Sequence, residues 1–406
     1  MELSLTRNQG IIRWIRYFVW AVLFAVSIEV SVRVDDWLTF KAPLLENFNN
    51  ESLYTSDPLG KRGKPYAHYL KWKLNSLGFR GPELRPDSLR IGTVGSSETF
   101  GLYESIDHEW PRELEHSLDS RSGSVSIEVV NFAFAGMLVS TFEKRLPEFI
   151  RQASPQVVII YPSIVGELYR PGNFGPKPKP KPDVKAPMPP SKISNPPTMA
   201  KDQVRVASAS PAPELRISYR AQTIFKNNAP HWLLDWLRER NAYRIFANTP
   251  VVMDRAPDSL LDNFRDDIKK VIFELRARGV VPVLVTHATY FGPRLDSHET
   301  PMMINWRQFY PMLKEEGFLD LEARANAVLK DIAFSEHLIL IDAASMMPEG
   351  GEFFADFVHF TDRGSKIFSE LIAERLQCLK QRGIDCLATG ESPLSHSRAT
   401  GLANPE

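Results

Sequence analysis

Short apolar runs alternate with helix-period patterns along most of this chain. Five such runs predict strands, and the first four are each followed by apolar residues at helical spacing. The run VVIIY over 157–161 is the most strand-like, and the helix over 258–278 is the clearest, because its apolar stripe ends at Gly279. The predicted strands are 89–94, 126–132, 157–161, 280–286 and 338–341, and the predicted helices are 111–118, 141–151, 258–278, 321–334 and 363–378.

Strands separated by helices favour parallel pairing with right-handed crossovers. The predicted fold class is therefore α/β, a doubly wound, mostly parallel five-stranded sheet with helices on both faces. A proline-rich segment, 171–215, interrupts this order and contains the run KPKPKPDVKAPMPP. Because no packed core can be built from that composition, we expect a disordered insertion in a loop. The domain would then comprise residues 88–170 and 216–390, with an extended arm over 37–87 before it and a disordered tail over 391–406 after it.

The amino end combines basic residues with an apolar run. Three arginines precede the uncharged residues 17–28, and Glu29 ends the run. This length is short of the ~20 residues that cross a bilayer comfortably, but flanking apolar residues extend it. We favour a signal-anchor helix within 1–36, single-pass in the inner membrane, with the basic end in the cytoplasm and the domain facing the periplasm or exterior. A signal peptide cleaved at 25–27 and a buried helix are the alternatives.

Composition excludes some classes of function. The 406 residues carry 49 basic and 49 acidic side chains, so no net field attracts a polyanion and nucleic-acid binding is disfavoured. Two cysteines, Cys378 and Cys386, are too few for a four-ligand zinc site, and we expect no metal and no cofactor. Export would favour a disulfide between them, with two unpaired thiols as the alternative.

The first predicted strand ends in a tight polar turn, GSSETFG over 95–101. A serine just past the carboxyl end of a strand, here Ser97, is where an α/β sheet exposes a nucleophile. A turn or helix-capping serine is the alternative. Two familiar motifs do not fit: Thr99 stands where the G-x-S-x-G elbow needs glycine, and Gly101 is not followed by the lysine of a P-loop.

A second polar pair stands in the loop before the last predicted helix. Asp356 precedes His359 by three residues, close enough in a turn to accept the imidazole Nδ1–H and stabilise an imidazolium. The alternative is that both are surface residues. Thr361 can cap the helix in either case, so it does not discriminate. His287, after the strand over 280–286, is a further candidate for the cleft, and a satisfied loop histidine is the favoured interpretation there.

Together these residues resemble the SGNH, or GDSL-type, hydrolases. The family's G-D-S-x-T-x-G block aligns with 95–101, with Ser96 in place of its aspartate. Its G-x-N-D block is not matched: no asparagine follows the strand over 157–161, and Ser163 or Val165 stands at that place, depending on the register. The resemblance covers about 74–378 outside the insertion, and Asn75–Gly81 resembles the segment before the serine in membrane-anchored bacterial members. The other matching residues are Asn131 and Gly136 in the second block, and Asp356, His359, Thr361 and Gly364 in the closing block.

The resemblance implies an SGNH/flavodoxin-like fold and a serine mechanism. Ser97 would be the nucleophile, His359 the general base and acid, and Asp356 its orienting partner. The N–H groups of Ser97 and Gly136 would hold the oxyanion, with Ser163 as a candidate third donor. The implied substrate is an acyl ester, with acetyl favoured, on an envelope or extracellular carbohydrate, and water or a sugar hydroxyl as acceptor would make the protein an esterase or an O-acyltransferase. Because losing one oxyanion donor typically costs ~10²–10³ in turnover, the alternative is a degenerate scaffold that binds polysaccharide or envelope proteins.

Overall fold

The computed structural model describes residues 2–119, 126–170, 215–218, 220–221, 225, 230–249, 252–292, 300–377 and 379. The chain divides into two compact units. One comprises residues 1–48 with 169–228, and the other comprises 49–168 with 229–406. Most of the predicted insertion, the predicted tail and both cysteines lie outside the described residues.

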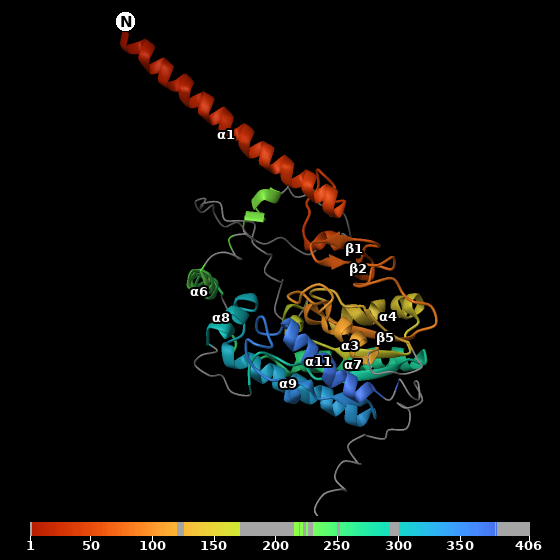
Figure 1. Cartoon of the computed structure of the whole chain (residues 1–406). Coiled ribbons are helices and arrows are strands. Elements are labelled where there is room, and N and C mark those ends of the chain that lie inside the picture. The colour runs from red at the N-terminus through yellow and green to blue at the C-terminus, as the bar shows by residue number, and fades with distance from the viewer. Residues whose placement is uncertain are drawn as a thin grey trace, which may run out of the picture. The chain divides into compact units, whose positions relative to one another are not determined.

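The first unit contains α1 (Glu2–Phe40), drawn in red in Figure 1 as one unbroken helix. Its part from Arg13 to Phe40 is long and apolar enough to cross a membrane, with a mean hydropathy of 1.7 and none of the apolar window buried. A signal sequence near an amino end has the same properties, so the helix fits either an anchor or a signal. The helix continues to Phe40, past the predicted boundary at residue 36.

Glu29, the residue that ends the uncharged run, has a defined role within this unit. Its carboxylate accepts the backbone N–H groups of Arg216 and Ile217 at 3.0 Å each. The Arg216 guanidinium is buried and pairs with Asp36 of α1 at 3.2 Å. The segment around Arg216 is therefore bound along the polar, carboxyl-terminal part of α1, and the uncharged apolar stretch ends at Ile28.

The second unit is built on a five-stranded sheet in which every pairing is parallel. The strand order is β6-β5-β7-β8-β9, which is the 2-1-3-4-5 order of flavodoxin-like sheets. The chain adds β6 on one side of β5 and β7 on the other, so the order of strand addition reverses between β5 and β7. This confirms the predicted fold class. Ligands in such sheets bind beyond the carboxyl ends of the strands near the reversal. The strands are β5 (Leu89–Gly95), β6 (Ile127–Asn131), β7 (Val157–Tyr161), β8 (Val281–Val285) and β9 (Ile339–Ile341).

Helices cover both faces of the sheet. Every residue of β6 and of β7 is buried, which explains why these strands are continuous apolar runs without alternation. On one face α3 (Trp110–Asp119) packs against α11 (Asp362–Leu376), and their apolar residues join a core that includes Ile91, Val157 and Val283. Elsewhere α4 (Val139–Ala153) packs against α7 (Asp258–Ala277), and α7 against α9 (Glu315–Ser335).

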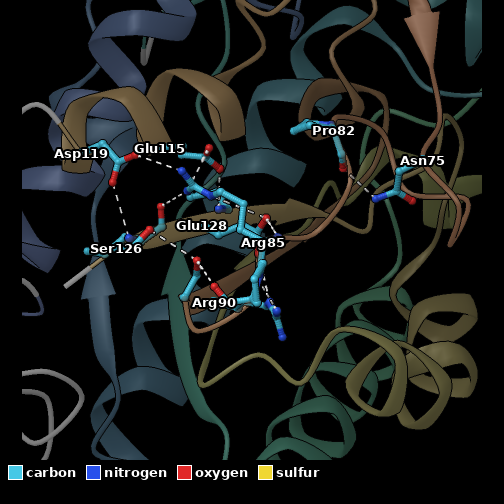
Figure 2. Close-up of polar contacts among 12 residues, drawn as sticks. Asn75, Pro82, Arg85, Arg90, Glu115, Asp119, Ser126 and Glu128 are labelled. Atoms are coloured by element: carbon cyan, nitrogen blue, oxygen red, sulfur yellow. Dashed lines mark hydrogen bonds and ion pairs between the residues drawn. The ribbon is translucent and has the colours of Figure 1, made fainter.

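The region predicted as an extended arm contains small hairpins, and from Asn49 onward it belongs to the sheet unit. The Asn75 side-chain amide donates to the carbonyl oxygen of Pro82 at 3.0 Å, and the Arg85 guanidinium lies among carboxylates of α3 and β6 (Figure 2). These contacts fix the end of the arm at the amino edge of β5 and β6. The remaining elements are η1 (Asn50–Leu53), β1 (Tyr54–Asp57), β2 (Gly60–Gly63), β3 (His68–Tyr69), β4 (Trp72–Lys73), α2 (Ser97–Phe100), η2 (Val165–Tyr169), α6 (His231–Ala247), α8 (Thr300–Phe309) and α10 (Ala343–Met346).

Candidate active site

Ser97 stands where the sequence predicted it, just past the carboxyl end of a strand. Gly95 is the last residue of β5, and Ser97 is the first residue of the short helix α2. A Cβ atom at Gly95 would lie 2.1 Å from Oγ1 of Thr99 and 2.6 Å from the carbonyl oxygen of Tyr161. Only glycine therefore allows α2 to pack this closely on the ends of β5 and β7, which accounts for the first glycine of the motif. At the other end of α2, Gly101 adopts the left-handed conformation, with φ at 84°, and ends the helix.

Asn131 holds the serine turn in place. Its buried side-chain amide donates to the carbonyl oxygen of Thr99 at 2.8 Å, and its Oδ1 accepts the N–H of Ala133 at 3.0 Å. The side chain therefore connects α2 to the loop after β6. Gly136, in the same loop, is exposed and has a φ of 76°, with no atom within 4 Å of a Cβ placed there. Its position leaves open space beside its backbone, and its role as an oxyanion donor stays a prediction.

The arm supplies a clamp for α2 that the sequence did not predict. The buried Arg80 guanidinium donates to the carbonyl oxygens of Phe100 and Gly101 and pairs with Glu109 at 2.9 Å. Trp72 adds a hydrogen bond from Nε1 to the Gly101 carbonyl at 3.1 Å. These bonds satisfy carbonyl groups at the carboxyl end of α2 that no helical partner would satisfy. The NSLGFRG run that contains Arg80 was the only signal available in the sequence.

Asp356 and His359 form the pair that their spacing predicted. Nδ1 of His359 lies 2.8 Å from both carboxylate oxygens of Asp356, and both side chains are buried. Oδ1 of Asp356 also accepts the N–H groups of Val358 and His359, so the turn itself holds the carboxylate. A carboxylate at Nδ1 fixes the proton there and leaves Nε2 to act as a base. Nε2 of His359 is buried and has no hydrogen-bond partner among the described residues.

Two further residues of the closing block have structural roles. Thr361 accepts the N–H of Gly364 at 3.1 Å and caps α11, as expected of this threonine in either interpretation. A Cβ atom at Gly364 would lie 1.9 Å from the carbonyl oxygen of Phe353. These two residues therefore set the loop that carries His359 close against the start of α11.

The loops carrying Ser97 and His359 meet at the carboxyl edge of the sheet. Tyr103, three residues beyond α2, lies with its ring 5.1 Å from the imidazole of His359. The Ser97 hydroxyl donates to Oε2 of Glu98 at 3.2 Å, so in the resting structure it is not bonded to His359. Catalytic hydrogen bonds are often loose without substrate, and a rotation of the hydroxyl away from Glu98 would free it. The triad of Ser97, Asp356 and His359 thus remains a prediction in which the Asp356–His359 contact is observed.

Glu98 belongs to a buried chain of charged groups that the sequence did not indicate. Its Oε1 lies 3.5 Å from Nε2 of His287, whose Nδ1 lies 3.0 Å from Oε2 of Glu322 on α9. The backbone N–H of His287 donates to the side-chain oxygen Oδ1 of Asn326 at 2.8 Å. His287 is therefore buried, as favoured, but only in part satisfied: Nδ1 contacts Glu322, whereas Nε2 makes no hydrogen bond among the described residues and lies beside Glu98, next to the predicted nucleophile.

The electrostatics of these groups follow from burial and from one another. Burial alone would raise the pKa of Glu98, but the contact with His287 and the charges of both histidines lower it to about 2. Burial alone would lower the pKa of His287, but Glu322 and Glu98 raise it to about 10. For His359, burial likewise lowers the pKa, and the contact with Asp356 and the charges of Asp356, Glu98 and Glu104 outweigh it and raise the pKa. Both histidines are thus stabilised as imidazolium ions.

No asparagine occupies the position of the third oxyanion donor. Ser163 follows β7 and lines a small pocket with Gly95, Met137 and Pro162, where the loops after β5, β6 and β7 meet. Val165 is buried and begins η2. Of the two residues at this place, Ser163 is the one at the pocket, and its role as a donor stays a prediction. Among the residues that the structure describes, no group of three or more metal-ligating side chains could hold an ion.

Comparison with known proteins finds no matching family model and no matching curated relative. Solved structures do match. The chain is similar to a lipase/acylhydrolase from Enterococcus faecalis, at 14% identity and a TM-score of 0.40, over 71% of this chain and 95% of that one. It is also similar to a GDSL-like lipase from Bacteroides thetaiotaomicron, at 11% identity and a TM-score of 0.38, over 71% and 88%. A third match is an acetylxylan esterase from Geobacillus stearothermophilus, solved as a catalytic mutant, at 12% identity and a TM-score of 0.38, over 72% and 95%. These proteins are of the type that the sequence blocks resemble, and at this level of similarity they carry no argument about the site.

Proposed function

We propose that this protein is an SGNH-type serine hydrolase that cleaves or transfers acyl esters. The observation that carries the proposal is the Asp356–His359 pair, with its unpartnered Nε2, at the same edge of the sheet as Ser97. An unpartnered polar atom in a buried position is costly, and a base that awaits the serine hydroxyl accounts for it.

In the proposed reaction Oγ of Ser97 attacks the ester carbonyl carbon, and its proton passes to Nε2 of His359. The N–H groups of Ser97 and Gly136, with Ser163, hold the oxyanion. The carbon–oxygen bond to the leaving alcohol then breaks, and His359 returns its proton to that oxygen. Water or a second hydroxyl group attacks the acyl-enzyme, with His359 again as base; the bond from the acyl carbon to Oγ of Ser97 then breaks, and His359 returns the proton to that oxygen. Water gives an esterase, and a sugar hydroxyl gives an O-acyltransferase.

The proposed substrate is an acyl ester, with acetyl favoured, on an envelope or extracellular carbohydrate. Its support is the resemblance to the SGNH hydrolases and the apolar helix α1. In this proposal α1 is a single anchor in the inner membrane, and the arginines before the apolar run keep the amino end in the cytoplasm. The second unit would then face the periplasm or exterior.

A scaffold without activity is the second candidate. It is favoured by the serine at position 96, by the missing asparagine after β7 and by the contact that holds the Ser97 hydroxyl on Glu98. A binding protein, however, would have no use for retaining Ser97, Asp356 and His359 together, with the Asp356–His359 contact formed at the edge of the sheet that carries Ser97.

Burst kinetics separate the two candidates. We expect the full-length protein in detergent to release p-nitrophenol from p-nitrophenyl acetate in a burst, one equivalent per active site, and Ser97→Ala to abolish it. An unfolding temperature of Ser97→Ala equal to that of the wild type would show that the variant is folded. Equal rates in the two proteins would refute the serine mechanism.

A further inference from the structure

Among the described residues, Glu98 is the buried carboxylate that contacts the Ser97 hydroxyl; it also lies 3.5 Å from the imidazole of His287, and its charge acts on that of His359. We propose that Glu98 is a positioning residue: held by His287 and Glu322, it fixes the Ser97 hydroxyl in the resting enzyme and stabilises the His359 imidazolium during acyl transfer. The inference rests on the proposed function and adds to it a residue outside the predicted triad.

Three different elements build this arrangement. Glu98 lies on α2, His287 follows β8, and Glu322 lies on α9, and all three residues are at most 5% exposed. Continuous contacts connect them to the nucleophile: 3.0 Å from Glu322 to His287, 3.5 Å from His287 to Glu98 and 3.2 Å from Glu98 to Oγ of Ser97. The carboxylate of Glu98 therefore has little freedom to leave the serine.

The count of charges gives this arrangement a chemical consequence. Glu98, Glu322 and Asp356 contribute three carboxylates, and His287 contributes one cation. With His359 neutral the cluster has an excess of two negative charges, and with His359 protonated the excess is one. Buried charge is tolerated when it is paired, so the cluster favours the protonated imidazole. His359 becomes protonated when Ser97 attacks, and this step would relieve the excess.

The other groups that face His359 do not replace Glu98 in this role. Glu104 is buried after α2, where burial raises its pKa to about 7, so it is largely neutral below that pH. Tyr103 packs on the imidazole ring, and burial and the charge of Asp356 raise its pKa to about 12, so it is neutral. Tyr161 packs its ring 5.2 Å from that of His287 and is also neutral, because burial raises its pKa. Below pH 7, where the acid limb is expected, the charge of Glu98 therefore acts on His359 together with that of Asp356, while Glu104 is largely neutral.

The proposal predicts a specific change in pH dependence. Serine reacts only when His359 is neutral, so the rate falls on the acid side as His359 becomes protonated. Replacing Glu98 by glutamine removes an opposite charge from the surroundings of His359. In the pH–rate profile of Glu98→Gln, we expect the acid limb, where the rate falls as His359 becomes protonated, to move to lower pH by about one unit or more.

The converse substitution gives a shift of opposite sign. His287→Gln removes the cation that neutralises Glu98, so Glu98 acts on His359 without compensation. We expect the acid limb to move to higher pH in this variant. If Glu98 and His287 served stability alone, either substitution would lower the unfolding temperature, but the two would not move the acid limb of the pH–rate profile in opposite directions. If Glu98→Gln does not fold, the direction of the His287→Gln shift alone decides.

The assay is the rate at which a fluorophosphonate labels Ser97 in the full-length protein, measured from pH 5 to 9. Glu274→Gln is the matched control, because Glu274 lies near the end of α7, which leads into the amino end of β8 at the opposite edge of the sheet. Its limb should coincide with that of the wild type. Labelling of the wild type with an unmoved limb in both variants would overturn the role of Glu98 alone. A wild type that labels no faster than Ser97→Ala would instead overturn the proposed function.

Discussion

Replacing Asp356 by asparagine tests the predicted triad most directly. The carboxylate lies 2.8 Å from Nδ1 of His359 through both of its oxygens. Asparagine keeps an oxygen that can accept the N–H groups of Val358 and His359, so the turn should survive. It removes the charge, however, and its NH₂ group can face Nδ1 and place the imidazole proton on Nε2.

The size of the effect follows from the geometry. Two unit charges about 4 Å apart interact by about 4 kcal/mol at the effective dielectric constant of pairs in proteins. If this stabilisation applies to the imidazolium formed in the transition state, its loss lowers turnover by about 10³-fold. Loss of the correct tautomer adds to this, as in other serine triads, where the same change costs about 10⁴-fold.

The measurement is the steady-state hydrolysis of p-nitrophenyl acetate by Asp356→Asn, beside thermal unfolding. Asp254→Asn is the matched control, because that aspartate is exposed and pairs with Lys314 at the surface. We expect the control to keep wild-type turnover. An Asp356→Asn protein that is folded and retains a tenth or more of wild-type turnover would refute the assignment of Asp356.

Two further predictions follow from the site. Because the contact with Asp356 and the charges of Asp356, Glu98 and Glu104 outweigh burial and raise the pKa of His359, kcat/KM should be lost as the pH falls through a midpoint above 6.5, and a midpoint at or below 6.5 in a pH profile would contradict this. Arg80→Met leaves buried Glu109 without its cation and should lower the free energy of unfolding by about 3–5 kcal/mol in denaturant melts. The exposed Arg62→Met in the same arm should change it by less than about 0.5 kcal/mol, and equal effects of the two variants would show that the clamp on α2 contributes nothing.

The sheet could be predicted because its strands carry their own signal. Parallel strands buried on both faces appear as uninterrupted apolar runs; β6 to β9 lie within the predicted ranges, and β5 extends one residue beyond its range, to Gly95. The elements α2 and α10 were not predicted, because a four-residue helix is too short to show a period. Helix α8 was missed as well, since its apolar residues surround the helix without forming a clear stripe.

The candidate site could be predicted in part. The contact between Asp356 and His359 is local, so a spacing of three residues was enough to indicate it. The partners of Glu98 come from α9 and from the loop after β8, far along the chain, and no pattern in the sequence connects them. The same holds for Arg80, whose partners on α2 are defined only when the arm has folded back.

The clamp from the arm sets a practical limit on how the protein can be shortened. An expressed fragment that begins at β5 would keep every predicted catalytic residue, yet it would lack the guanidinium and indole groups that hold the carbonyl oxygens of Phe100 and Gly101. It would also leave Glu109 buried without a counter-ion. A water-soluble form suitable for crystallisation or inhibitor screening should therefore start at Asn49, where the second unit begins.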